Sequence, residues 1–250
     1  MRVAALYDIH GNLPALDAVL HDVRRQHVDI IVVGGDVLPG PMPLETMRRL
    51  LTLDIPVRFV HGNGDRVVHA YLKGEPIDEV PPPYRQSIYW TAERLDAECR
   101  GAIATWPATR TVRIDALGDV LFCHATQRND VDCFTRRTPD HLVARLFAGV
   151  SASVVVCGHT HMQFDRQVGD LRIVNAGSVG VPFAPPRGAH WLLLGPDVQF
   201  QQTLYDFDNA AEQLRGTGFP LVDQTVVRYV LNPPPEADTL AMFAPADSRT

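Results

Sequence analysis

The sequence predicts a mixed α/β fold in which sheets and helices form a sandwich. The first 65 residues alternate apolar runs with helical periodicity in the order β-α-β-α-β, which is typical of a parallel sheet. From about residue 109, short turn sequences such as GD and GPD separate apolar segments, which favours antiparallel hairpins. With 250 residues, 46% of them hydrophobic, the chain is long enough for one core of ordinary size.

In the first half, apolar runs predict strands and amphipathic stretches predict helices. The predicted strands are 2–8, 29–36 and 55–65. Two helices are predicted between them. The second covers 43–51, and the apolar face of the first carries Leu13, Leu16, Val19, Leu20 and Val23. A proline-rich loop at 74–84 follows, either a lid or a plain connector. A helical stretch over about 85–104 ends this half.

In the second half, three hairpins are predicted. They pair 110–114 with 119–124, 164–168 with 171–177, and 190–194 with 198–205. Helices are predicted at 139–149 and 209–215, and residues 224–231 fit a strand or a helix.

We therefore expect a single domain over residues 1–231 and an extended tail over 232–250. Met242 and Phe243 in the tail either dock on the body or on a neighbouring subunit, or belong to a frayed end.

Composition excludes several classes of function. A net charge of −6 argues against binding to a nucleic-acid duplex or an anionic membrane, both of which need a basic surface. There is no run of about 18 apolar residues for a membrane span. The first ten residues turn acidic too early for a signal peptide, so we expect a cytoplasmic protein. The four cysteines show no spacing typical of a disulfide framework or a zinc finger.

Polar side chains that can bind metals follow the predicted strands. They are Asp8, His10, Asp36, Asn63, His124, His159 and His161. Each one alone is more often a turn former, a helix cap or surface decoration. Together they indicate a site, because ligands of open α/β sheets gather at the carboxyl ends of strands. Their number suits a pair of divalent cations that share one carboxylate.

The motifs around these residues resemble those of the calcineurin-like metallophosphoesterases, in particular the small bacterial and archaeal phosphodiesterase branch. The matching blocks are DIHGN at 8–12, GGD at 34–36, GNGD at 62–65, CHA around His124, GHTH at 158–161 and NAGSVG at 175–180. The resemblance extends from residue 3 to about residue 200. It implies a four-layer α-β-β-α sandwich of two mixed sheets, in agreement with the pattern above.

The resemblance also implies a role for each of the seven residues. Asp8, His10 and His161 would hold one metal. Asn63, His124 and His159 would hold the other, and Asp36 would bridge both. The catalytic set is then Asp36, Asn63 and His124.

These assignments predict a metal-dependent phosphoesterase. Two cations lower the pKa of a shared water, so that a bridging hydroxide attacks phosphorus in line without a covalent intermediate. The metal expected first is Mn²⁺, and Fe, Zn²⁺, Co²⁺ or Ni²⁺ also suit these ligands. The substrate is expected to be a small phosphodiester. The alternatives are a phosphomonoesterase acting on a phosphoprotein or a dinucleoside polyphosphate, or a metal-binding scaffold without activity.

Substrate-binding residues are less well marked. Many relatives have a histidine that protonates the leaving group where this chain has Gly64, an absence that the small phosphodiesterases often share. His61 stands where several relatives have a phosphate-binding arginine, and is either a substrate ligand or a structural residue. Arg66 and Arg187 either clamp an anionic substrate or are solvated, and Asn63 could turn its amide toward a phosphate oxygen. We expect no membrane partner, and leave a homo-oligomer open.

Overall fold

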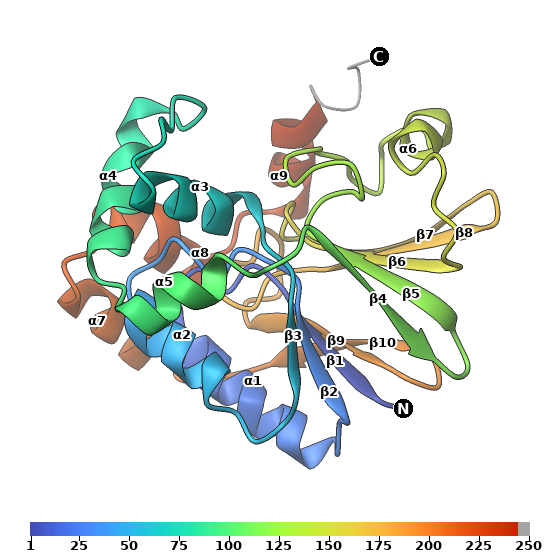
Figure 1. Cartoon of the computed structure of the whole chain (residues 1–250), viewed down its shortest axis with the longest axis horizontal. Coiled ribbons are helices and arrows are strands. Elements are labelled where there is room, and N and C mark those ends of the chain that lie inside the picture. Colours follow the sequence, from blue (N-terminus) through green and yellow to red (C-terminus); the bar gives the residue numbers. More distant parts are fainter. Residues whose placement is uncertain (245–250) are drawn as a thin grey trace.

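Two five-stranded sheets lie face to face in the computed structural model, which describes residues 1–244 (Figure 1). The first sheet has the strand order β10-β9-β1-β2-β3. Its strands are β1 (Val3–Leu6), β2 (Ile30–Val33), β3 (Val57–Phe59), β9 (Ala189–Leu194) and β10 (Val198–Thr203). β1, β2 and β3 are parallel, as the β-α-β-α-β pattern predicts, while β9 and β10 run antiparallel to their neighbours.

The second sheet has the order β4-β5-β6-β8-β7. Its strands are β4 (Thr109–Ile114), β5 (Gly118–Cys123), β6 (Val154–Cys157), β7 (Gln163–Val168) and β8 (Leu171–Ala176). The hairpins β4-β5 and β7-β8 are antiparallel, and β6 joins them by parallel pairing on both sides. All three predicted hairpins are therefore confirmed, counting β9-β10 in the first sheet.

The inner faces of the two sheets form one apolar core. Val3 and Ala5 of β1 pack there with Phe122 of β5 and Val156 of β6. The buried Tyr7 crosses this interface and donates its hydroxyl to the Val156 carbonyl at 2.9 Å. A β-carbon on Gly34 would lie 1.9 Å from the Tyr7 ring, so only glycine fits at this point of close approach.

Helices cover the outer face of each sheet, which completes four layers. The first sheet is covered by α1 (Leu13–Arg25), α2 (Pro43–Leu51), α3 (Asn63–Leu72), α4 (Pro82–Glu93) and α5 (Ala97–Ile103). The second is covered by α6 (Asp140–Leu146). α1 begins where the Asn12 side chain accepts the Ala15 N–H, and it buries the apolar face that the sequence predicts. The predicted α-β-β-α sandwich is confirmed.

Two local predictions need correction, and one alternative that the sequence leaves open is decided by the structure. The stretch 85–104 is two helices, because the chain turns after α4 and Asp96 caps α5 by accepting the Cys99 N–H. The strand predicted over 55–65 ends at Phe59, and α3 begins at Asn63. Residues 224–231, left open between strand and helix, are helical: a π-helical turn η1 (Asp223–Val227) continues into α8 (Arg228–Leu231).

The C-terminal segment is helical rather than extended over most of its described length. After α7 (Phe207–Gly216) and α8, helix α9 (Glu236–Phe243) follows Pro235, with Glu236 and Asp238 in its first turn. Its Thr239 and Leu240 are buried, whereas Met242 is 56% exposed. Residues 245–250 of the predicted tail lie outside the described part, and the domain division at residue 231 stays a prediction. Within residues 1–244 we find no helix with the length and apolarity needed to cross a bilayer.

Candidate metal centre

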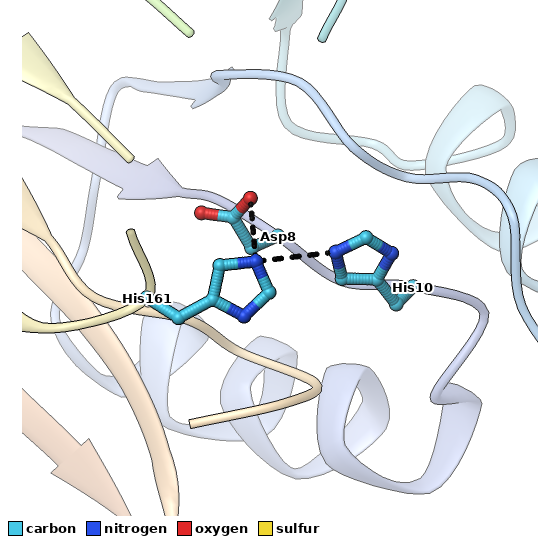
Figure 2. Close-up of side chains that lie close together, drawn as sticks. All are labelled: Asp8, His10 and His161. Atoms are coloured by element: carbon cyan, nitrogen blue, oxygen red, sulfur yellow. Dashed lines mark hydrogen bonds and ion pairs between the residues drawn. The ribbon is translucent and has the colours of Figure 1, made fainter. Parts of the chain in front are cut away.

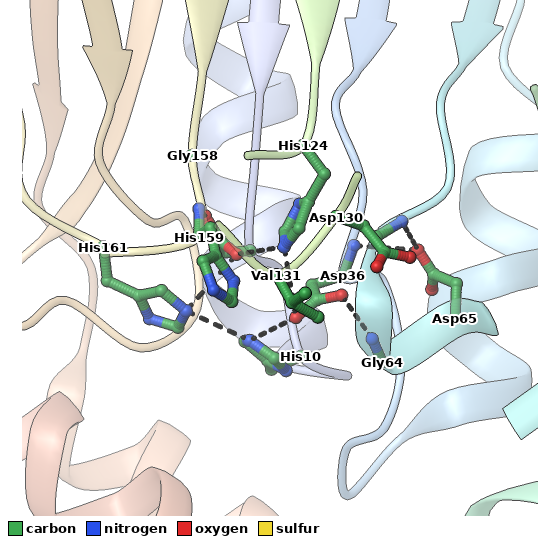
Figure 3. A network of polar contacts seen from close by, with 12 residues as sticks. His10, Asp36, Gly64, Asp65, His124, Asp130, Val131, Gly158, His159 and His161 are labelled. Atoms are coloured by element: carbon green, nitrogen blue, oxygen red, sulfur yellow. Dashed lines mark hydrogen bonds and ion pairs between the residues drawn. The ribbon is translucent and has the colours of Figure 1, made fainter. Parts of the chain in front are cut away.

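All seven predicted ligands lie in the segments that follow strands of the two sheets. Figure 3 shows five of them close together: His10, Asp36, His124, His159 and His161. Asp8 and His10 follow β1, Asp36 follows β2, and Asn63 is the first residue of α3. His124 follows β5, and His159 and His161 follow β6. The parallel strands of each sheet point the same way, so chain segments that are 151 residues apart in sequence meet at one edge.

The backbone at this edge is strained. Seven residues other than glycine have a positive φ in residues 1–244, and five of them are predicted ligands: Asp8 (53°), His10 (47°), Asp36 (51°), His159 (66°) and His161 (56°). Such a conformation costs of order 1–3 kcal/mol per residue and persists where the surroundings impose it. Five such residues in these loops indicate that the backbone here is held in the conformation that orients the candidate ligands.

Asp8, His10 and His161 form the first group (Figure 2). His161 Nε2 lies 3.3 Å from Asp8 Oδ1 and 3.3 Å from His10 Nε2. The other oxygen of Asp8 accepts the His159 backbone N–H at 3.0 Å. Asp8 Oδ1 is buried and has no hydrogen-bond partner. A cation bound between this oxygen and the ring nitrogens would provide the missing partner.

Asp36 lies between the first group and the second. Its Oδ2 is 3.7 Å from His10 Nε2 and 3.6 Å from His124 Nε2. Its Oδ1 accepts the Gly64 backbone N–H at 2.7 Å. Asp8, Asp36 and His124 also form a set whose ligand atoms all lie within 4.8 Å of one another. Asp36 is thus placed where a bridging carboxylate would have to be.

Asn63 and His159 complete the second group beside His124. The amide oxygen of Asn63 faces acceptors; only with the amide turned over would its NH₂ donate to His159 Nδ1 at 3.0 Å and to His124 Nε2 at 3.2 Å. An amide oxygen and two ring nitrogens that face one another form an electron-rich cluster, and a cation between them would relieve it. The rings of His124 and His159 meet edge to face, with centroids 5.1 Å apart.

The pKa shifts of His10, His159 and Asp8 suit metal binding. Burial lowers the pKa of His159 to about 4 and also lowers that of His10, so both imidazoles are neutral at pH 7. Burial alone would raise the pKa of Asp8, but the nearby His161 outweighs it and the net pKa is lowered. The same pairing raises the pKa of His161 against the effect of burial. Neutral imidazoles and ionised carboxylates are the forms that bind metals.

Asp65 supports the candidate site through backbone contacts, a role that the sequence pattern does not single out. It is fully buried, and its carboxylate accepts the backbone N–H groups of Asp36 (2.8 Å), Gly62 (3.0 Å) and Leu38 (2.9 Å). It therefore ties the loop after β2 to the start of α3. Burial and the nearby Asp36 raise its pKa well above the usual value. In the sequence, Asp65 is marked only as the last residue of the GNGD motif.

Asn175 has a similar role in the loop after β6. Its side chain donates to Gly158 O at 2.6 Å and accepts the Gly177 N–H at 2.9 Å. This links the end of β8 to the GHTH segment, and the signal was the first letter of NAGSVG.

Arg66 is near the centre but is occupied by carboxylates. It binds Asp130 in a bidentate manner, with Nε to Oδ2 at 2.7 Å and the second contact at 3.2 Å, and it donates to Glu79 at 3.0 Å. His61 Nδ1 lies 3.5 Å from the same Asp130. Both residues therefore face Asp130, and their predicted contact with substrate stays a prediction.

Arg187 is exposed, and its guanidinium lies 4.6 Å from the centroid of the Phe207 ring. This cation–π contact occupies one face of the guanidinium. A contact of Arg187 with substrate likewise stays a prediction.

The residues present fit a pair of divalent cations. The donor set combines carboxylate, amide and imidazole groups, and it includes an orphaned carboxylate oxygen and an amide oxygen aimed at acceptors. Such donors suit first-row transition metals.

Comparison with known proteins gives a consistent result. Residues 1–194 match a family model described as a calcineurin-like phosphoesterase superfamily domain. An uncharacterised protein of Methanocaldococcus jannaschii is 26% identical over 196 residues, covering 72% of this chain and 76% of that protein. The 3',5'-cyclic adenosine monophosphate phosphodiesterase CpdA of Pseudomonas aeruginosa is 25% identical over 222 residues, covering 78% and 81%. The crystal structure of a metallophosphoesterase from Sphaerobacter thermophilus superimposes with a TM-score of 0.68 at 27% identity, covering 90% and 97%.

Proposed function

The chain belongs to the calcineurin-like phosphoesterase superfamily, and from this premise we propose that it hydrolyses small phosphodiesters with the help of two divalent metal ions. The observation that carries the proposal is the convergence of two carboxylates, one amide and four imidazoles at one sheet edge, where a buried oxygen of Asp8 lies beside His161 without a hydrogen-bond partner. A fold that kept this architecture for structural reasons alone would gain nothing from five strained ligand residues.

Each metal position has its own set of side chains. Asp8, His10 and His161 would hold one ion, Asn63, His124 and His159 the other, and Asp36 would contact both. When bound, the two cations supply a nucleophile at neutral pH by lowering the pKa of water, and they neutralise charge on the phosphoryl group. Manganese is the ion we expect first.

The protein contributes orientation. Asp65 and the Gly64 N–H fix Asp36 from two sides, so its carboxylate does not have to reorganise when a substrate arrives. The neutral imidazoles of His10 and His159 stay available as ligands across the physiological range of pH. No serine or cysteine stands in a motif for covalent catalysis, so we propose direct hydrolysis.

The absence of a side chain at Gly64 bears on the choice of substrate. A β-carbon there would lie 2.2 Å from the Leu38 carbonyl oxygen, so this backbone leaves no room for an acid at that place. We propose that turnover therefore depends steeply on the leaving group. The similarity to a cyclic-nucleotide phosphodiesterase supports a diester as the substrate class. Cytoplasmic location and the absence of membrane and nucleic-acid partners stay predictions.

One comparison tests the proposal. Protein stripped of metal is assayed with bis-(p-nitrophenyl) phosphate and with p-nitrophenyl phosphate, before and after addition of Mn²⁺. Activity that appears only with metal, and is greater on the diester, is the expected result. A preference for the monoester would favour a phosphomonoesterase.

The rival is a metal-binding scaffold. Two equivalents of bound metal with no hydrolysis of either ester would favour it. All seven ligand positions here keep competent side chains, which supports the enzyme.

A further inference from the structure

Three of the four histidines in the centre are oriented by backbone carbonyl groups. The contacts run from His10 Nδ1 to Pro39 O (3.2 Å), from His124 Nδ1 to Gly34 O (3.1 Å) and from His161 Nδ1 to Val181 O (2.6 Å). A carbonyl oxygen only accepts, so in the neutral ring Nδ1 carries the hydrogen and Nε2 keeps its lone pair. In all three rings Nε2 is the nitrogen that faces the carboxylates. The outer contact thus selects the tautomer that can bind a cation.

His159 is the exception, because its ring is reversed and its outer partner is a thiol. Its Nδ1 faces the Asn63 amide, and its Nε2 lies 3.3 Å from Cys133 Sγ. Cys133 lies in the segment that connects β5 to α6.

The contact between Cys133 and His159 suits one tautomer of the His159 ring. Its S–H donates to the Val131 carbonyl at 3.6 Å. In the tautomer of His159 that carries its hydrogen on Nε2, this N–H donates to the Cys133 sulfur at 3.3 Å. The ring then has its lone pair on Nδ1. This is the tautomer that the second metal position requires.

The other three cysteines of the chain are placed differently. Cys99, Cys123 and Cys157 are fully buried, whereas Cys133 is partly exposed. Burial raises the pKa of the Cys99 thiol to about 12 and raises those of Cys123 and Cys157 as well. A water-soluble thiol reagent should therefore modify Cys133 first.

We propose that Cys133 is a positioning residue for His159, and that retention of the metal ion beside Asn63, His124 and His159 depends on an unmodified thiol at this position. The inference rests on the proposed function, because it presumes that the centre binds a metal pair. The orphaned oxygen of Asp8 is the independent sign that the centre takes a cation. Groups that orient a ligating histidine typically change metal affinity by about 10- to 100-fold when they are removed.

Titration with Co²⁺ tests this directly, because it reads metal binding rather than turnover. Wild type, Cys133→Ala, Cys133→Ser and the control Cys99→Ala are stripped of metal and titrated while visible absorption and bound metal are measured. We expect Cys133→Ala to bind the first ion normally and the second about 10-fold more weakly. Serine also accepts from Nε2–H, so Cys133→Ser should recover most of the loss, and Cys99→Ala should match wild type.

Two results would overturn the inference. One is a second Co²⁺ that Cys133→Ala binds as tightly as wild type. The other is a sulfur-to-cobalt charge-transfer band in wild type that vanishes in Cys133→Ala, which would make Cys133 a direct ligand. A wild type that binds two ions normally but hydrolyses no ester would sink the proposed function and leave the role of Cys133 standing.

Alkylation provides a second variant of the test. The Cys133 sulfur displaces iodide from iodoacetamide and becomes a bulky thioether. Native protein modified once should lose the second ion to the extent seen in Cys133→Ala, whereas Cys133→Ala treated alike should not change further. Full retention of both ions by protein shown to be modified at Cys133 would contradict the proposal.

Discussion

The backbone N–H of Gly64 donates to Asp36 Oδ1 at 2.7 Å, and this leaves Asp36 Oδ2 to face His10 and His124. One carboxylate is thereby shared between protein backbone and candidate ligands. The first α3 turn and the loop after β2 depend on each other at this point, since Asp65 also accepts the Asp36 N–H.

Introducing a side chain at Gly64 should damage the centre rather than restore a missing acid. A β-carbon at this position would meet the Leu38 carbonyl oxygen at 2.2 Å, so Gly64→Ala and Gly64→His must both displace backbone. We expect a loss of about 1–3 kcal/mol in the free energy of unfolding, measured by urea denaturation of metal-free protein. Metal content should fall as well.

Gly101→Ala is the matched control for Gly64. A β-carbon on Gly101, in helix α5, would meet no atom within 4 Å. Because alanine is the better helix former, this variant should be up to about 1 kcal/mol more stable than wild type, with unchanged metal content. A Gly64→His protein of full stability with increased activity would contradict the steric argument.

Replacing Asp36 by asparagine should affect both metal positions at once. Its Oδ2 is the atom near both His10 and His124, and an amide cannot neutralise two cations. Metal stabilisation of a phosphoryl transition state is worth several kcal/mol, and each 1.4 kcal/mol is about tenfold in rate. We therefore expect kcat to fall at least about 100-fold, with fewer than two bound ions by elemental analysis. Two tightly bound ions in this variant would rule out a bridging role.

Arg66 should act through Asp130 rather than on the substrate. The guanidinium holds the Asp130 side chain, and the Asp130 backbone carbonyl lies beside the Asn63 amide. Arg66→Lys loses the bidentate contact, so we expect kcat to fall about 10-fold through displacement of Asn63, with KM changed by less than about twofold. Steady-state kinetics on the diester separates the two effects.

Arg172→Lys is the control for Arg66, because Arg172 makes the same bidentate contact with Asp165 on β7 and β8. It should leave both constants unchanged. A rise in KM alone in Arg66→Lys would instead identify Arg66 as a substrate clamp.

Acid should destabilise the folded protein partly through His190. This side chain is 5% exposed and contacts the Pro186 carbonyl, and burial lowers its pKa below the usual 6.5. The unfolded chain therefore takes up this proton at a higher pH than the folded protein. Its contribution is fully present above pH 6.5 and is lost as the pH falls toward the lowered pKa.

His190→Gln should remove this part of the pH dependence. We expect its free energy of unfolding to fall less than that of wild type between pH 7.5 and pH 5, measured on metal-free protein by urea denaturation. The quantity to compare is the change of the unfolding free energy with pH, not its absolute value. Parallel slopes for the two proteins would show that His190 titrates normally.

The convergence of the candidate ligands at one edge could be predicted from sequence because it depends on local features. Each apolar run ends in a polar residue beside a turn former, and parallel strands place such ends together. The contacts that orient the ligands could not be predicted in this way. Arg66 and Asp130 are 64 residues apart, and Cys133 meets His159 across 26 residues. The periodicity of apolar residues in the sequence does not indicate either contact.

Two errors came from competing local signals. The glycines around Asn63 suggested a strand end followed by a loop, although Asp65 side-chain contacts start a helix there. The prolines at 233–235 suggested an extended tail, although proline followed by acidic residues also starts helices, as α9 does.

The division of the ligands between the sheets has a mechanical consequence. One sheet carries Asp8, His10, Asp36 and Asn63, and the other carries His124, His159 and His161, so neither layer owns a complete set. Any pair of ions held there would link the two layers at one rim, in addition to the hydrogen bonds that Tyr7 and Asp8 already make between them. Loading the centre would then make unfolding of either layer depend on the other at this rim.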